Sequence, residues 1–265
     1  MKKRNLIYVT CMLIAMGACS ATSKNQAEVV IDTWGKYNVG TILFEDKAPE
    51  TKGSDVYHRI IPDAESYIKA QAREVLATLY NSPDDSIPTV NKIHYTLEDI
   101  EGVSAKGGGN GDVTIFYSTR HIEKSFAAND TAKLFFETRG VLLHELTHAY
   151  QLEPQGIGSY GTNRVFWAFI EGMADAVRVA NGGFDGPNAR PKGGNYMDGY
   201  RTAGYFFVWL RDNKDPEFLR KFNRSTLEVV PWSFDGAIKH ILGKEYNIDE
   251  LWHEYQVAVG DIQAQ

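Results

Sequence analysis

Residues 140–151 read GVLLHELTHAYQ, and this segment constrains the fold more than any other part of the chain. Its leucines, alanine and tyrosine supply the apolar surface of a helix that packs in a core. His144 and His148 lie four residues apart, so both imidazoles project from the same side of that helix. Burying these histidines together with Glu145 requires partners, because an unpaired polar group in a core costs free energy. The segment therefore predicts a core helix whose polar residues have a function.

His144, Glu145 and His148 form the pattern H-E-x-x-H on this predicted helix. In that arrangement two histidines one turn apart bind Zn²⁺, and the glutamate beside the first acts as general base on a water molecule. The competing interpretation is two locally satisfied core histidines next to a surface glutamate. It is disfavoured because three polar groups would be buried without a common partner. We expect His144 and His148 to be zinc ligands and Glu145 to be catalytic.

A catalytic zinc ion needs a third protein ligand and one open position. Residues 166–180, FWAFIEGMADAVRVA, predict a second helix in which Glu171 has apolar neighbours and Asp175 lies one turn further on the same face. Solvated carboxylates on an exposed helix are the ordinary alternative, and the apolar neighbours argue against it. We expect Glu171 to be the third ligand and Asp175 to accept a hydrogen bond from the N–H of a ligand histidine. An exchange of these two roles stays open.

Composition and charge limit the class of protein. The chain has 265 residues, 43% hydrophobic and 23% charged, as in a folded globular protein. Its formal net charge is −6, and it becomes −9 when the three basic residues at positions 2–4 are excluded with the N-terminal segment. Such an acidic chain has no basic cluster for a phosphate backbone. Nucleic acid is therefore excluded as a partner.

The N-terminus has the pattern of a secretory signal. Basic residues 2–4 precede an apolar run at 6–16, and the small residues Gly17 and Ala18 follow. This run is too short for a permanent membrane span. We expect residues 1–18 to be a signal peptide of the lipoprotein type.

Cys19 follows Gly17 and Ala18 as in a bacterial lipobox, which predicts lipidation at Cys19. Residues 19–28 are small and polar and form a tether. The protein is then exported and held at the bacterial cell envelope, with membrane contact only through this lipid. Met16 departs from the usual lipobox, so ordinary cleavage and secretion are the alternative. The other cysteine, Cys11, lies within the signal, so no internal disulfide is expected.

One folded domain is expected over residues 29–265, since no linker or internal repeat interrupts it. Strand-like patterns occur at 29–34, 41–45, 90–99 and 112–118, with a flexible loop at 105–112. Helical patterns occur at 63–80, 132–152, 166–180, 200–212, 216–224 and 249–259. Residues 181–195 are rich in Gly, Pro and Asn and predict a long irregular loop, which in a compact domain is often functional.

These motifs resemble one known family. LEDIEGVSA, Glu137, GVLLHELTHAYQ, IEGMADAVR, DGYRTAGYFFVWL and IDELWHEYQ occur in the order found in the plant basic secretory protein family, zincin-like metallopeptidases also present in bacteria. The resemblance covers most of residues 29–258. It implies secretion and an α+β zincin-like fold, with a small mixed sheet packed on the active-site helix and a mainly helical C-terminal half. The chain departs from the family in being acidic, so no role that depends on positive charge carries over.

The resemblance also implies roles in catalysis. A tyrosine hydroxyl is needed to face the developing oxyanion, and Tyr200 matches a tyrosine of the family pattern, with Tyr205 as the fallback. The alternative for either is an ordinary half-buried core tyrosine. In zincins the substrate lies along the outer strand before the active-site helix, which the analogy assigns to residues 112–118.

The sequence thus predicts an exported zinc metallopeptidase that acts on a peptide or (glyco)protein. Two alternatives remain. One is a cell-envelope protein that binds a glycan or glycoprotein on a zincin scaffold, against which the intact Glu145 argues. The other is a zinc amidase for a non-peptide amide, since the same metal and base serve any carbonyl.

Overall fold

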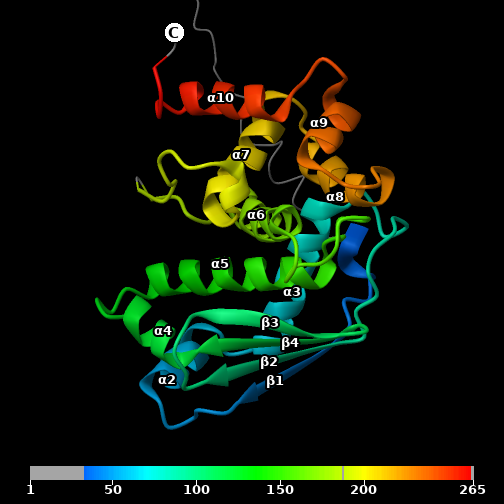
Figure 1. Ribbon diagram of the computed structural model, residues 1–265. Helices are drawn as coiled ribbons and strands as arrows, with labels where there is room; N and C mark the ends of the chain where they lie inside the picture. Colours follow the sequence, from blue (N-terminus) through cyan, green and yellow to red (C-terminus); the bar gives the residue numbers. More distant parts are fainter. Residues whose placement is uncertain (1–32, 187, 264–265) are drawn as a thin grey trace, which may run out of the picture.

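The computed structural model describes residues 33–186 and 188–263 (Figure 1). The predicted signal peptide 1–18, the lipidation site Cys19 and the tether 19–28 lie outside the described residues. The elements in chain order are β1 (Thr41–Asp46), α2 (Lys52–Ile60), α3 (Ala64–Leu79), β2 (Lys92–Glu98), β3 (Ser104–Gly109), β4 (Asp112–Ser118), α4 (Thr119–Ser125), α5 (Thr131–Tyr150), α6 (Arg164–Ala180), the 3-10 turn η1 (Tyr196–Asp198), α7 (Tyr200–Asn213), α8 (Phe218–Glu228), α9 (Phe234–Leu242) and α10 (Ile248–Ala258).

The four strands form one mixed sheet with the order β1-β2-β4-β3. The pairs β1–β2 and β2–β4 are parallel, and β3 pairs antiparallel with β4. Alternate residues point to opposite faces of a sheet. On one face the paired residues Ile93 and Val113, and Tyr95 and Ile115, are buried. This apolar face is the one that the long helices can cover.

Helices α3 and α5 cover the apolar face, and α5 lies between the sheet and the C-terminal helices (Figure 1). On α5, Leu142, Leu143 and Leu146 are almost fully buried. The second half of α5, from Gly140 to Tyr150, is packed on both sides and mostly apolar, so His144, Glu145 and His148 stand out there.

The C-terminal half is helical and has an aromatic core. Phe169 of α6 packs edge-to-face on Phe222 and Trp232, with ring centroids 5.2 and 4.7 Å apart. Helix α7 approaches α6 closely at Gly204, where a Cβ would lie 2.9 Å from the backbone of Asp175. The expected α+β class, with a small mixed sheet on the helix that carries the H-E-x-x-H pattern and a mainly helical C-terminal half, is confirmed.

Two predictions about the sheet are wrong. Residues 105–112 are not a flexible loop, because most of them form β3, which a two-residue turn joins to β4. Asn110 and Gly111 have φ values of 53° and 84°, the left-handed backbone that a tight hairpin of this kind needs. Residues 112–118 are consequently an inner strand, and β3 is the edge strand. The Asn-Gly pair is a hairpin signal in the sequence that the run of glycines obscured.

Helix predictions were accurate for the long elements and incomplete for the short ones. The expected helices at 63–80, 132–152, 166–180, 200–212, 216–224 and 249–259 all exist, with ends shifted by a few residues. The short helices α2, α4 and α9 were not expected, and residues 33–35, partly assigned to a strand, are helical. A search of the described residues for a helix long and apolar enough to cross a bilayer finds none.

Candidate metal centre

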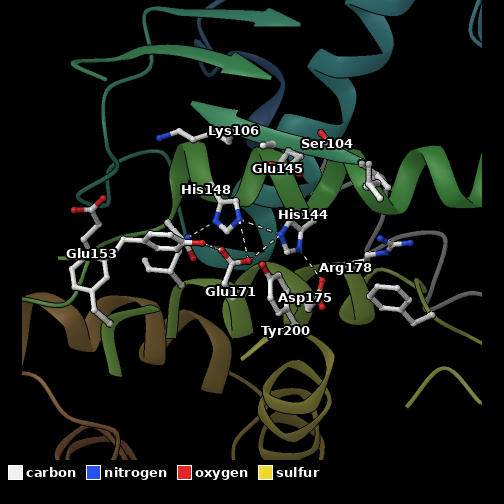
Figure 2. Close-up of a pocket in the computed structure, with 18 residues that line it drawn as sticks. Ser104, Lys106, His144, Glu145, His148, Glu153, Glu171, Asp175, Arg178 and Tyr200 are labelled. Carbon is white, nitrogen blue, oxygen red and sulfur yellow. Dashed lines mark hydrogen bonds and ion pairs between the residues drawn. The ribbon is translucent and has the colours of Figure 1, made fainter. Parts of the chain in front are cut away.

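Helix α5 presents three polar residues to a cleft of about 630 Å³. The helix begins after Asp130, whose side chain accepts a hydrogen bond from the backbone N–H of Lys133. Near its other end His144, Glu145 and His148 all line the cleft. Figure 2 shows both imidazoles projecting from one side of the helix toward the next helix of the chain. This is the shared face that the four-residue spacing predicts.

Helix α6 lies opposite and contributes two carboxylates. It begins after Asn163, whose side chain caps the backbone N–H groups of Val165 and Phe166. Glu171 and Asp175 are each only 4% exposed, and they face the histidines of α5 (Figure 2). The structure thus brings together all four residues that the sequence predicted around the metal.

The potential ligand atoms form a triangle of the size that zinc requires. Nε2 of His144 lies 3.1 Å from Nε2 of His148 and 3.3 Å from Oε2 of Glu171, and the third side is 3.7 Å. Bonds of about 2.0–2.1 Å in a tetrahedral zinc site separate neighbouring ligand atoms by about 3.3 Å. Within the described residues, these three are the group of His, Cys, Asp or Glu side chains that can hold a metal ion. The donor set fits zinc.

The outer nitrogen of each histidine also has a partner. Nδ1 of His144 lies 2.7 Å from Oδ1 of Asp175, so the carboxylate accepts the proton on Nδ1 and leaves Nε2 free for a metal. Nδ1 of His148 lies 2.8 Å from Nε2 of the Gln151 side chain, and the carbonyl oxygen of the same amide is buried with no partner among the described residues. Rotation of the amide by half a turn would place that oxygen against Nδ1. An amide oxygen is the group that accepts a proton from Nδ1 of a metal-bound histidine. Gln151 was not predicted, although its position three residues after His148 places it on the same helix face.

The charges at the site call for a cation. Burial alone lowers the pKa of His144, but hydrogen bonds with Asp175 and Glu171 outweigh it and raise that pKa to about 10. Burial and the charge of His144 lower the pKa of His148 to about 3. Burial opposes ionisation of Glu171, whereas the neighbouring histidines lower its pKa below the usual value. The two carboxylates therefore favour a positive charge in the cluster. A bound metal ion would provide that charge while Nε2 of each histidine stays unprotonated.

Glu145 lies on the side of the cleft nearest the edge strand β3. It is 6% exposed, and burial raises its pKa, while hydrogen bonding with the Ser104 side chain and the Lys106 backbone opposes the increase. Figure 2 shows Glu145, Ser104 and Lys106 on one side of the histidines, with Glu171, Asp175 and Tyr200 on the other. The carboxyl is thus separate from the ligand triangle but next to it, as a general base must be.

The two predicted tyrosines occupy different places. The Tyr200 ring stacks on the His144 imidazole at 6.1 Å and lines the cleft, and its φ of 42° is uncommon for a bulky residue. Its hydroxyl has no hydrogen-bond partner among the described residues. Tyr205 does not line the cleft, and its hydroxyl donates to the backbone carbonyl of Phe184.

A third tyrosine at the site was missed by the sequence analysis. The hydroxyl of Tyr160 donates to Oε1 of Glu171 at 2.5 Å. Burial and hydrogen bonding to Glu171 raise the pKa of Tyr160, so the phenol keeps its proton. Tyr160 lies in the loop between α5 and α6, where no periodicity marks a functional residue. Only the folding of that loop reveals the contact.

Comparisons with known proteins identify the family of this chain. The sequence pattern of a family described as peptidases of plants and bacteria, the basic secretory protein family, matches residues 39–255. A search of curated proteins finds no match. Among solved structures, one from Bacteroides caccae, described provisionally as a zinc-binding metallo-peptidase, is 10% identical and has a TM-score of 0.25, with 94% of this chain and 98% of that chain covered. Since the family match spans most of the chain, including both helices of the candidate metal centre, this protein belongs to the family of peptidases of plants and bacteria.

Proposed function

We propose that the protein is an exported zinc metallopeptidase in which His144, His148 and Glu171 hold the metal. The observation that carries the proposal is the triangle of ligand atoms, with sides of 3.1, 3.3 and 3.7 Å, beside the buried carboxyl of Glu145. A purely structural zinc site has four protein ligands and no use for a base. Three ligands and a neighbouring carboxyl are the set that hydrolysis requires.

His144, His148 and Glu171 would hold a Zn²⁺ ion, which when bound would supply the Lewis acidity that makes water a nucleophile near pH 7 and polarises a carbonyl group. Glu145 accepts the proton of the attacking water and passes it to the leaving amine. Its position beside the ligand triangle supports this role, since a general base must lie within reach of the proton that it accepts. Asp175 keeps the proton of His144 on Nδ1, which holds the imidazole in the tautomer that binds the metal.

Tyr200 is the residue that stabilises the oxyanion in this proposal. Its hydroxyl is uncommitted among the described residues, and its ring is fixed against His144 and Trp167, with centroids 6.1 and 5.4 Å apart. The fallback, Tyr205, has its hydroxyl occupied by the Phe184 carbonyl. A donor held ready for the developing charge needs no reorganisation during the reaction. This difference favours Tyr200.

The substrate is a peptide or (glyco)protein that lies along the edge strand β3. An edge strand offers unpaired backbone groups to which an extended peptide can add. Val103, next to β3, is 41% exposed, and Tyr160 and Tyr200 across the cleft are 46% and 47% exposed. Exposed apolar and aromatic side chains around a cleft are typical of a surface that binds a large ligand.

The proposed location is the bacterial cell envelope, with lipid on Cys19 as the anchor, and secretion after ordinary signal cleavage is the alternative. The signal pattern in residues 1–18 supports export, and the polar segment 19–28 is long enough to separate the domain from the membrane. The acidic chain gives no reason to expect nucleic acid as a partner.

The decisive experiment compares wild-type residues 20–265 with the Glu145→Gln variant on a mixed library of peptides and glycoproteins, and maps new termini by mass spectrometry. We expect the variant to keep one zinc per chain and to lose about 10²–10⁴-fold in cleavage rate, the usual contribution of a general base. Equal cleavage by the zinc-loaded variant contradicts the mechanism. If the zinc-loaded wild type makes no cuts, a glycan-binding protein or a non-peptide amidase becomes the better hypothesis.

A further inference from the structure

Tyr160 contacts the metal centre from a loop that no motif marks. It is 46% exposed at the rim of the cleft, yet its hydroxyl reaches the buried carboxylate of Glu171. The side chain therefore spans from solvent to a residue that is only 4% exposed. The hydrogen bond to Glu171 is the contact that directs the hydroxyl of this exposed side chain inward.

The loop itself is built to present Tyr160. Residues 159–162 form a turn in which the N–H of Thr162 donates to the carbonyl of Ser159 at 3.0 Å. The side chain of Asn163, which also caps α6, donates to the carbonyl of Ile157 at 2.6 Å. These bonds fix the loop to the start of the helix that carries Glu171. Tyr160 is thus presented by an ordered turn.

The two oxygens of Glu171 have different partners. Oε2 faces the Nε2 atoms of His144 and His148 at 3.3 and 3.7 Å, whereas Oε1 accepts the hydrogen bond from Tyr160 at 2.5 Å. Carboxylates bind metals through one oxygen or both. The hydrogen bond from Tyr160 thus occupies one lone pair of Oε1, and the oxygen that faces Nε2 of both histidines is Oε2.

We propose that Tyr160 is a positioning residue that keeps Glu171 a one-oxygen ligand. This inference rests on the proposed zinc centre and deepens it. A catalytic zinc site needs an open position for water or substrate. If Oε1 also bound the metal, it would occupy that position. Tyr160 therefore preserves the open position by holding Oε1, although it does not touch the metal or the reacting atoms.

The test compares Tyr160→Phe with Tyr196→Phe. Tyr196 makes the same kind of bond elsewhere, from its hydroxyl to Oδ1 of Asp249 at 2.9 Å, and it does not line the cleft. Each protein is prepared without metal, its thermal unfolding is checked, and it is titrated with Co²⁺ and with Zn²⁺ against a chelator. Four-coordinate Co²⁺ absorbs visible light much more strongly than five- or six-coordinate Co²⁺, so the spectrum reports the number of ligand atoms.

We expect Tyr160→Phe to reduce the visible absorption of bound Co²⁺ and to weaken zinc binding by about 10- to 100-fold, as loss of an outer hydrogen bond to a ligand commonly does. Tyr196→Phe should match the wild type in both. A wild-type cobalt spectrum in Tyr160→Phe overturns the proposal, whatever the affinity. The result is separable from peptidase activity. An altered spectrum in Tyr160→Phe supports the role of Tyr160 even where the zinc-loaded wild type cleaves no peptide, the outcome that counts against the peptidase.

Discussion

Two clusters of histidine and carboxylate join α5 to its neighbours, and they differ in how charge is balanced. One contains His144, His148, Glu171 and Asp175. The other lies nearer the start of α5, where Glu137 accepts hydrogen bonds from Nη2 of Arg178 at 2.6 Å and from His121 at 3.2 Å. In this second cluster the guanidinium supplies the positive charge permanently.

The first cluster has no such cation among the residues that form it. Two imidazoles face Glu171 and Asp175, with the raised pKa of about 10 at His144 as the consequence. The two clusters, which lie on neighbouring parts of α5, therefore balance the negative charge of their carboxylates in two different ways. The second cluster contains its own cation and is structural, whereas the first is suited to a metal ion that would add the positive charge.

The largest expected effect is on zinc affinity, which should depend on the residues of the first cluster and not on those of the second. Glu171→Ala removes a proposed ligand, and we expect zinc affinity to fall by more than the 100-fold that marks the upper range for outer partners. Asp175→Ala, which frees Nδ1 of His144, should cost only about 10- to 100-fold. Competition titration with a chelator measures both. Loss of metal in Asp175→Ala with retention in Glu171→Ala would reverse the two assignments.

Breaking the second cluster should destabilise the protein and leave the metal site intact. Glu137→Ala leaves the Arg178 side chain, which is 7% exposed, without its carboxylate, and because the Glu137 side chain is 26% exposed we expect a loss of about 1–3 kcal/mol. Urea denaturation measures the loss, and zinc affinity should stay at the wild-type value. The double variant with Arg178→Met is the matched control, because an apolar replacement of both partners recovers stability. A change within about 0.5 kcal/mol, as for surface substitutions, would mean that the pair contributes nothing.

The smallest expected effect is the pH dependence of this pair. Burial opposes ionisation of Glu137, but the hydrogen bond with His121 and the charge of Arg178 lower its pKa below the usual value. The lowered pKa adds stability that is fully present above the unfolded value of about 4.3 and is lost as pH falls through the folded pKa. The difference in unfolding free energy between wild type and Glu137→Gln should therefore be largest near pH 7 and shrink below about pH 4. A difference that grows on acidification would contradict this sign.

A glycine explains why Arg178 can reach Glu137 at all. The guanidinium crosses α5 at Gly140, where a Cβ would lie 2.4 Å from Nε, and it stacks on the Phe184 ring at 3.7 Å. Glu137 belongs to the motifs that carry the family resemblance, but nothing in the sequence indicates its partner. Such a pairing depends on how two helices cross, and local periodicity contains no information about that crossing.

The long helices were predictable because their apolar residues recur at helical spacing, and several of them also begin after a capping Asp or Asn. Asp130 and Asn163 cap α5 and α6, and both helices were expected within two residues at their first turns. The edge strand β3 was not predictable in the same way. Its glycines have little strand preference, and only pairing with β4 stabilises the extended backbone.

The sequence by itself determined the H-E-x-x-H pattern of α5, the carboxylates of α6 and the class of fold, because spacing along one helix fixes which side chains share a face. Tertiary structure decided which partners those side chains meet. It placed Asp175 and not Glu171 against Nδ1 of His144, and it bonded the Tyr205 hydroxyl to the Phe184 carbonyl. It also brought Tyr160 into contact with Glu171, and Gln151 into contact with His148. These contacts depend on helix crossing and loop closure, which act between segments far apart in the chain and leave no local pattern in the sequence.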